Sequence, residues 1–387
     1  MNDSPKPKLW ILFFLIAVLA AGVVRIAVRG IRSGSSASCP SRLVRAAETT
    51  PQARTALPAS QQKWRRQWIF PAGASLSDAP TALADGWVVT TDKGRIAALG
   101  CDGRERWSVQ FTNGAFTGSA AVARPTVVAL RSNGDVVGLD AATGRSLWQV
   151  SVEGSFRHGP FAFRVGDAWR VALLSSEDGT IRCLDAGNGH DVWQAEPTNR
   201  TDGSPACGDG LIVFGNCDSA VHLISVTNGE HVANISVGTD AQMAGGALFK
   251  GGYVYGGTRG GDLVCVGIST QKVIWRAKIQ EKEAFNTPVA ARDAVVMGAD
   301  DGTVTAFDAV RGAERWRVSL SNAVSALCAV DDAVFAVAGG KLIGLRVSDG
   351  GTFFSQSIGD HVEGPVCNGR SLVVADDGGT VIGLAGE

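Results

Sequence analysis

The stretch TVVALRSNGDVVGLDAATGRSLW, from Thr126 to Trp148, decides the fold of this chain. An apolar run meets a turn that contains Asn133 and Gly134, a second apolar run follows, and a glycine turn then leads to Trp148. Asn-Gly turns supply the positive φ angles that tight hairpins need. The stretch therefore predicts an antiparallel β-meander.

The same pattern recurs in eight units from Asp78 onward. Successive central turns are 38 to 45 residues apart, which leaves room for four short strands in each unit. Repeats of about 40 residues with this content are typical of β-propeller blades. The eight central turns contain Gly94, Gly134, Gly179, Ser219, Gly261, Gly302, Gly340 and Gly379. The sequence therefore predicts an all-β fold, an eight-bladed β-propeller of four-stranded antiparallel blades.

A bulky side chain follows the second turn of most units. It stands four positions after a glycine in Gly103/Trp107, Gly144/Trp148, Gly189/Trp193 and Gly312/Trp316. Trp275 and Phe354 hold the same place in their units, and Ala233 is the exception. A tryptophan repeated at one blade position is expected to pack flat on the neighbouring blade, burying roughly 150–250 Å². The alternative is a set of aromatic rings that grips a ligand.

The two ends of the repeat region indicate how the ring closes. The last unit stops at GTVIGLAGE, one strand short, while an unpaired strand, KWRRQWIFP at Lys63–Pro71, precedes the first unit. One missing strand and one extra strand predict that the N-terminal strand completes the last blade and removes an open sheet edge. We therefore assign residues 63–387 to the propeller.

Residues 1–32 form a membrane anchor or a signal segment. The run Leu9–Val24 has sixteen apolar residues and follows Lys6 and Lys8. A spanning helix needs about 20 residues, so one N-terminal hydrophobic helix and a cleaved signal peptide both stay open. The run is followed by several arginines, which favour keeping the propeller in the cytoplasm. We nevertheless expect a membrane-anchored or periplasmic, exported protein, with the side of the membrane left open.

Residues 33–62 are rich in Ser, Ala, Thr and Gln and have little periodic hydrophobicity, which is typical of a flexible linker. The charges of the whole chain nearly balance, with 36 Lys and Arg against 37 Asp and Glu. This balance argues against a nucleic-acid partner. The propeller is expected to be a monomer.

Motifs that carry chemistry do not stand out. No two of the five histidines have a metal-binding spacing, and the glycines fall in strand-to-strand turns rather than in a phosphate-binding loop. The chain has no GxSxG or CxxC motif. We therefore predict no catalytic residues, no metal site and no cofactor.

The eight cysteines are spread through the repeats. Cys183 and Cys265 occupy one repeat position, and Cys207 and Cys367 occupy another. Equivalent positions in non-adjacent blades are too far apart for the Cα separation of roughly 4.4–6.8 Å that a disulfide requires. Most of the cysteines are thus predicted to be small buried apolar residues.

One set of polar residues stands just before the innermost strands of several units. In a propeller these junctions meet at one face, where ligands and partners usually dock. The hypothesis is that they form a recognition face, and the alternative is that they only solvate loops and satisfy strand ends. The residues are Arg157, His158, Asp202, Asn286 and Glu363.

Four runs carry a resemblance to a known family. GRIAALGCDGRERW, GDVVGLDAATGRSLW, GTIRCLDAGNGHDVW and GTVTAFDAVRGAERW resemble the tryptophan-docking repeats of quinoprotein dehydrogenases and of BamB-like outer-membrane assembly propellers. The resemblance covers about residues 64–387. Quinoprotein dehydrogenases typically carry a pair of adjacent cysteines and long insertions, and this chain has neither. The resemblance is therefore greater to the cofactor-free, BamB-like scaffolds.

The resemblance implies a function in binding rather than in catalysis. The expected role is a non-catalytic, membrane-tethered or exported scaffold that presents one propeller face to a protein partner. The alternative is a small-ligand sensor or a degenerate quinoprotein enzyme that uses the central funnel.

Overall fold

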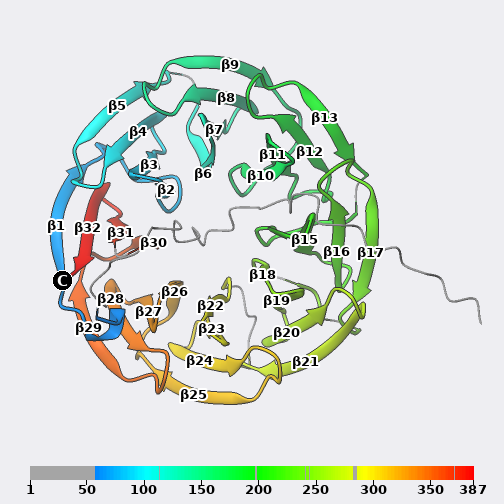
Figure 1. The fold of residues 1–387 in the computed structure, drawn as a ribbon, viewed down its shortest axis with the longest axis vertical. Helices are drawn as coiled ribbons and strands as arrows, with labels where there is room; N and C mark the ends of the chain where they lie inside the picture. The colour runs from blue at the N-terminus through cyan, green and yellow to red at the C-terminus, as the bar shows by residue number, and fades with distance from the viewer. Residues whose placement is uncertain are drawn as a thin grey trace, which may run out of the picture. The chain divides into compact units, whose positions relative to one another are not determined.

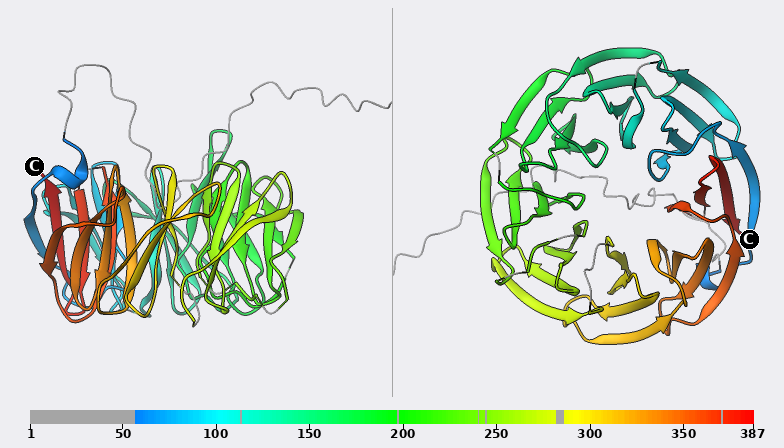
Figure 2. Two further views of the ribbon diagram at one scale, coloured as in Figure 1. Left: turned by 90° about the horizontal axis from the view of Figure 1, so that it is seen from below. Right: turned by 180° about the vertical axis from the view of Figure 1, so that it is seen from behind.

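The computed structural model describes residues 57–387 apart from residues 113, 197, 240, 244, 282–285 and 370. The described residues form eight sheets of four antiparallel strands, arranged side by side in a ring (Figure 1). In the side view the connecting loops gather at the two faces of this ring (Figure 2). The predicted eight-bladed β-propeller is confirmed. The predicted N-terminal hydrophobic helix lies outside the described residues.

Within each blade the first strand is innermost and the fourth forms the outer rim (Figure 1). We number the blades in chain order. Blade 1 contains β2 (Thr81–Leu83), β3 (Gly86–Thr90), β4 (Arg95–Gly100) and β5 (Glu105–Gln110). Blade 2 contains β6 (Phe116–Ala123), β7 (Thr126–Arg131), β8 (Asp135–Asp140) and β9 (Ser146–Ser151). Blade 3 contains β10 (Phe161–Val165), β11 (Ala168–Leu174), β12 (Ile181–Asp185) and β13 (Asp191–Ala195), and blade 4 contains β14 (Ala206–Gly208), β15 (Leu211–Gly215), β16 (Ala220–Ser225) and β17 (His231–Ser236).

Blade 5 contains β18 (Leu248–Lys250), β19 (Tyr253–Gly257), β20 (Asp262–Gly267) and β21 (Lys272–Lys278). Blade 6 contains β22 (Val289–Ala291), β23 (Ala294–Gly298), β24 (Thr303–Asp308) and β25 (Glu314–Ser319). Blade 7 contains β26 (Val324–Val330), β27 (Ala333–Ala338), β28 (Lys341–Arg346) and β29 (Thr352–Ser357), and blade 8 contains β30 (Val362–Asn368), β31 (Ser371–Asp376), β32 (Thr380–Gly386) and β1 (Trp64–Pro71).

Blade 8 is built from both ends of the described chain. Its outer strand β1 pairs antiparallel with β32, from Trp64 opposite Gly386 to Pro71 opposite Thr380. This is the closure that the unpaired N-terminal strand predicted. The packed region begins before residue 63, because a 3-10 helix covers Ala59–Gln61 and the backbone N–H of Ser60 donates to Asp332 Oδ1 at 3.0 Å. The last residues of the expected linker therefore belong to the propeller.

The central turn of every blade has a backbone conformation with positive φ, which few residue types other than glycine adopt readily. All eight turn residues predicted from the repeat have positive φ, from 61° at Ser219 to 87° at Gly134. Glycine reaches this left-handed region without steric cost, which explains its recurrence at seven of the eight turns. At Gly134, for example, a side chain would also meet the Val152 carbonyl oxygen.

The apolar core lies between neighbouring blades. The second strands β7 and β27 bury all six of their residues, because both faces of each blade are covered. In one cluster, Ile96 and Ala98 of blade 1 pack with Val127 and Leu139 of blade 2. Burial of apolar surface is the main favourable term in folding, so each blade depends on both of its neighbours.

Six tryptophans of the outer strands dock on the next blade in the ring. Each indole Nε1 donates a hydrogen bond to a backbone carbonyl oxygen at the second turn of that blade, as Trp193 does to Val226 at 3.1 Å. The ring also lies on the glycine of this turn, where a Cβ on Gly229 would stand 2.5 Å from Trp193. The prediction of flat packing on the neighbouring blade is confirmed. The six are Trp68, Trp107, Trp148, Trp193, Trp275 and Trp316.

The described cysteines fall into three groups. Cys183, Cys207 and Cys265 are buried, as predicted, whereas Cys101 is exposed and Cys217 is half-buried. Cys328 and Cys367 form a disulfide between blades 7 and 8 with a Cα separation of 6.2 Å, which the prediction of small buried apolar residues did not anticipate. The repeat comparison ruled out bonds between equivalent positions of distant blades, but these two cysteines stand in adjacent blades, on the innermost strands β26 and β30.

Candidate recognition face

The five predicted residues lie on or near the loops that lead into the innermost strands, on the face we call the junction face. Arg157 and His158 precede blade 3, Asp202 precedes blade 4, and Asn286 precedes blade 6. Glu363 lies within β30 of blade 8. The structure brings the first three into contact, whereas Asn286 bonds to other backbone groups and Glu363 belongs to blade 8.

Asp202 is the centre of an arginine cluster. Its carboxylate forms ion pairs with Arg157 Nη1 at 3.4 Å, Arg200 Nη2 at 3.1 Å and Arg259 Nη2 at 3.1 Å. The Asp202 side chain is 9% exposed, whereas those of Arg157 and Arg200 are 56% and 52% exposed. Burial raises the pKa of this carboxyl, but the hydrogen bond and charge of Arg200 and the charge of Arg157 outweigh it, so the pKa lies below its usual value. Asp202 is therefore ionised near neutral pH.

His158 holds the backbone of the same loop. Its Nε2 lies 2.8 Å from the Asp202 carbonyl oxygen. A carbonyl oxygen can only accept, so Nε2 carries the hydrogen in this bond. His158 thus connects the loop before blade 3 to the loop before blade 4.

The residues on either side of Asp202 fix the position of its loop. The Thr201 side chain is buried and donates from Oγ1 to the Gly215 carbonyl oxygen at 2.7 Å. Gly203 lies so close to blade 5 that a Cβ there would stand 2.1 Å from the Gly245 carbonyl oxygen. A side chain at that position would push the two loops apart. Asp202 therefore stands on a loop that is fixed on both sides.

Asn286 has a structural role. Its Nδ2 donates to the Gly298 carbonyl oxygen at 2.9 Å and to the Val324 carbonyl oxygen at 2.7 Å. These bonds join the loop before blade 6 to blade 7. Glu363 belongs to blade 8, where its backbone pairs with Ala375 of β31. Blade 8 is on the opposite side of the ring from blade 4 (Figure 1).

Arg200 and Arg259 were not predicted from the sequence. Arg200 stands two residues before Asp202, so local spacing could have indicated it. Arg259 lies in the turn between β19 and β20 of blade 5, 57 residues away from Asp202, and only the closed ring brings them together. The complete cluster therefore spans blades 3, 4 and 5.

The cluster gathers three guanidinium groups around one carboxylate. Guanidinium groups bind carboxylates well, because their donors match both carboxylate oxygens. No group of three or more His, Cys, Asp or Glu suited to a metal ion occurs among the described residues. The arrangement is suited to binding an acidic group.

Two hollows lie elsewhere and contain none of the five residues. One of about 270 Å³ lies between blades 2 and 3 and includes Ser132, Ser155 and Phe156. Another of about 520 Å³ lies at the other face of blade 1 and includes Asp85 and Arg106. The predicted set therefore does not line a common pocket in either place.

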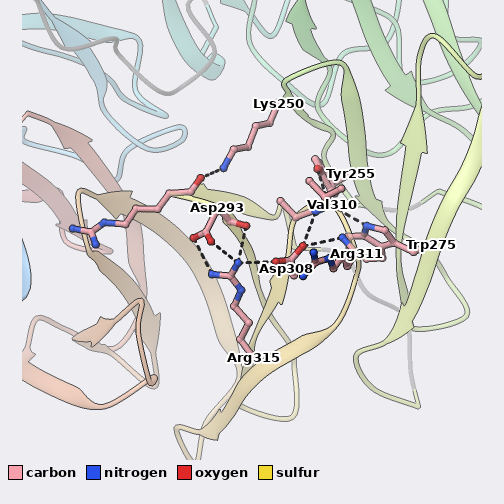
Figure 3. A network of polar contacts seen from close by, with 10 residues as sticks. Lys250, Tyr255, Trp275, Asp293, Asp308, Val310, Arg311 and Arg315 are labelled. Carbon is pink, nitrogen blue, oxygen red and sulfur yellow. Dashed lines mark hydrogen bonds and ion pairs between the residues drawn. The ribbon is translucent and has the colours of Figure 1, made fainter.

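A further polar network joins blades 5 and 6 (Figure 3). Arg315 Nη2 pairs with Asp293 at 2.6 Å and with Asp308 at 2.8 Å. The hydrogen bond from Arg315 lowers the pKa of Asp293 to about 2. Tyr255 and Trp275 both donate to the Ala309 carbonyl oxygen in the turn that Asp308 begins, so this network braces the two blades.

The ring of eight four-stranded blades with docked tryptophans defines the class of protein, a propeller of tryptophan-docking repeats. The family model described as outer membrane protein assembly factor BamB matches residues 56–158, 92–246, 177–360 and 300–387. These matches together span all eight blades. The chain belongs to the BamB family.

Curated relatives share this name at low identity. BamB of Burkholderia pseudomallei is 25% identical over 238 residues, which are 57% of this chain and 60% of the relative. BamB of Escherichia coli is 29% identical over 203 residues, 47% of this chain and 50% of the relative. BamB of Moranella endobia is 25% identical over 368 residues, 84% of this chain and 92% of the relative. For most of these relatives the chain spans about half of their length.

Solved structures share the fold. BamB from Moraxella catarrhalis superimposes with a TM-score of 0.72 at 19% identity, covering 84% of this chain and 100% of that one. The quinohemoprotein alcohol dehydrogenase from Comamonas testosteroni does so with a TM-score of 0.64 at 13% identity, covering 85% and 77%. Both likenesses establish the propeller architecture alone.

Within the part of the chain that the structure describes, no helix has the length and apolar character needed to cross a membrane. The expected anchor or signal, residues 1–32, lies outside that part.

Proposed function

We propose that this chain is a non-catalytic scaffold that docks a protein partner on the junction face around Asp202. The observation that carries the proposal is the cluster of Arg157, Arg200 and Arg259 about one carboxylate. Exposed charges of one sign steer association and select a partner of opposite sign. The partner surface is therefore acidic. The relatives are named outer membrane protein assembly factors, which supports a role beside other proteins.

An exported location fits the disulfide. Disulfides persist in oxidising compartments and are rare in the cytosol, where thiols are kept reduced. The Cys328–Cys367 bond therefore supports export, and the apolar run at Leu9–Val24 supports a membrane tether. The arginines after that run favour the opposite side, and the disulfide outweighs them because it concerns the folded domain itself.

The alternative, a small-ligand sensor or a degenerate quinoprotein enzyme, has less support. This function needs the predicted polar residues to line one funnel. The Asn286 side-chain amide, however, donates to backbone carbonyl groups, and Glu363 belongs to blade 8, on the opposite side of the ring from blade 4. The sequence also has no adjacent cysteines. The likeness to a dehydrogenase concerns the fold and does not carry an activity.

The test reverses the charge of the cluster. In the full-length protein, Arg157→Glu with Arg200→Glu should reduce recovery of crosslinked partners from a membrane extract by about tenfold or more, because complementary charge is lost. The control is Arg104→Glu with Arg65→Glu, which changes the same charge at two exposed sites away from the cluster; these side chains are 88% and 55% exposed.

Thermal melts should show that both double variants fold. Equal recovery of partners by the two folded variants would rule out this face as the docking surface. Loss of recovery in both would show that the interaction depends only on net charge.

A further inference from the structure

The junction between blades 4 and 5 lacks the tryptophan contact that joins most blades. At the position of the docked tryptophans, the outer strand β17 carries Ala233. The second turn of blade 5 carries Gln271, with φ of 51°, at the place where other blades have a glycine. Both halves of the contact are therefore missing together.

The loss of the tryptophan and the loss of the turn glycine are linked, because a docked indole ring leaves no room for a Cβ at the turn. A Cβ on the docking glycine would stand only 2.3 Å from the ring of Trp68 at Gly103, and 2.5 Å from that of Trp275 at Gly312. Real Cβ atoms do not approach that closely, so a tryptophan docks only on glycine. The Cβ of Gln271 occupies the equivalent space in blade 5. The junction could not accept a tryptophan at residue 233 without a change at residue 271.

The junction between blades 7 and 8 also lacks a docked tryptophan, since Phe354 takes its place, but it has substitutes. The Cys328–Cys367 disulfide crosses it. Trp64 of blade 8 contacts Phe335 of blade 7 there, with ring centroids 4.6 Å apart, and Phe354 packs on the same Phe335 within blade 7 at 6.2 Å. Among the described residues, the junction between blades 4 and 5 is thus the one without a docked tryptophan or a covalent link.

The hydrogen bonds and the ion pair that cross this junction lie on its inner side and at the junction face, where Arg276 Nη2 of β21 also donates to the Val237 carbonyl oxygen. Apolar packing crosses the junction as well, since Ala233 and Ile235 of β17 share a cluster with Val264 and Ile268 of blade 5. The Ala247 backbone N–H donates to the Ser204 carbonyl oxygen at 2.9 Å, and Asp202 pairs with Arg259 at 3.1 Å. At the outer rim, Val232 of β17 and Ile274 of β21 are 50% and 40% exposed. What the rim lacks, at its second-turn end, is the indole hydrogen bond that the neighbouring junctions have.

We propose that the propeller opens preferentially at the outer rim between blades 4 and 5, hinging on the inner strands and on the junction face. Opening there breaks no indole hydrogen bond and no disulfide, unlike opening at any other junction of the described ring. The proposal concerns the isolated propeller and does not depend on the proposed partner.

Hydrogen exchange of the full-length protein tests it directly. The amides of β17 should exchange about tenfold faster than those of β13 and β25, whose tryptophans dock, because exchange follows local opening. The comparison needs no variant. Equal exchange in the three strands would overturn the proposal.

Restoring the contact is the complementary test. Ala233→Trp with Gln271→Gly should slow exchange in β17 to the level of β13, whereas Ala233→Trp alone should not, because Gln271 blocks the ring. The reverse pair at the next junction, Trp275→Ala with Gly312→Gln, should make β21 exchange faster. A folded Ala233→Trp/Gln271→Gly variant with unchanged exchange in β17 would show that the missing contact does not control opening.

Discussion

Asp202 shows how one carboxylate can organise a surface that spans three blades. It pairs with Arg157, Arg200 and Arg259, which belong to the loops of three successive blades. Because its pKa is lowered in the folded state, it contributes stability at pH values above its unfolded pKa, near 3.9, and this contribution is lost as pH falls through the lower folded value.

Asp202→Ala should therefore lower the free energy of unfolding at pH 7 by about 1–3 kcal/mol, since three guanidinium groups lose a shared partner. Urea denaturation at pH 7 and at pH 3 measures the effect, and the difference from wild type should shrink at the lower pH. Asp167→Ala is the control, because that side chain is fully exposed beside Arg164 and should have almost no effect. Equal loss in both variants would contradict this role of Asp202.

Trp193 provides a second prediction for a single residue. Trp193→Ala should lower the free energy of unfolding by about 2–4 kcal/mol, somewhat less than for a fully buried aromatic residue, because the ring is partly exposed. Chemical denaturation measures the change. A midpoint equal to that of wild type would mean that the contact with Gly229 and Val226 contributes little.

For single residues, the sequence predicted the roles of those that recur at one position of each repeat. It did not predict contacts between residues of different repeats. The tryptophans and turn glycines recur at one place in each unit, so a comparison of units finds them. Arg259 and the Cys328–Cys367 pair have no counterpart in the other units, and their partners are brought near only when neighbouring blades stack.

Among the elements, β1 has the largest consequence for the ring. It covers the edge of β32, and its Trp68 docks on blade 1 by donating to the Cys101 carbonyl oxygen at 2.8 Å. Deletion of Lys63–Phe70 should therefore lower the melting temperature and solubility far more than deletion of residues 33–56, although the second deletion is longer. Thermal melts and sedimentation compare the two. Similar behaviour would mean that blade 8 is stable with three strands.

The disulfide between β26 and β30 is the second link between elements that closes the ring. Its residues are 39 apart in sequence. Cys328→Ser should lower the free energy of unfolding by about 3–4 kcal/mol on the chain-entropy account of such a link. Denaturation with and without reductant measures this, and the reductant should destabilise the wild type but not the Cys328→Ser variant. Cys207→Ser, at the blade 4 position equivalent to Cys367, is the control and should keep its response to reductant.

On the scale of the whole molecule, the fold could be predicted because each blade repeats the same local rules. Hairpin turns, buried strands and, in six of the eight blades, a docked tryptophan specify a meander of about 40 residues, and eight such units close a ring. The cluster around Asp202 could be predicted only in part, because Arg157 and His158 contact Asp202 while no described contact joins Asn286 or Glu363 to it. Loops differ between units, so the repeat carries no information about which loop residues meet.

The closing strand also sets the order of events during synthesis. β1 is made first and its partner β32 is made last, with Trp64 paired to Gly386. At about 5–20 residues per second, roughly 15–60 s separate the two strands. Seven blades can stack in order during that time, while the first-made strand has no partner. A finished ring is therefore a sign that synthesis has passed residue 386, and a chain released before that point would keep a bare strand edge by which it could be retained or degraded.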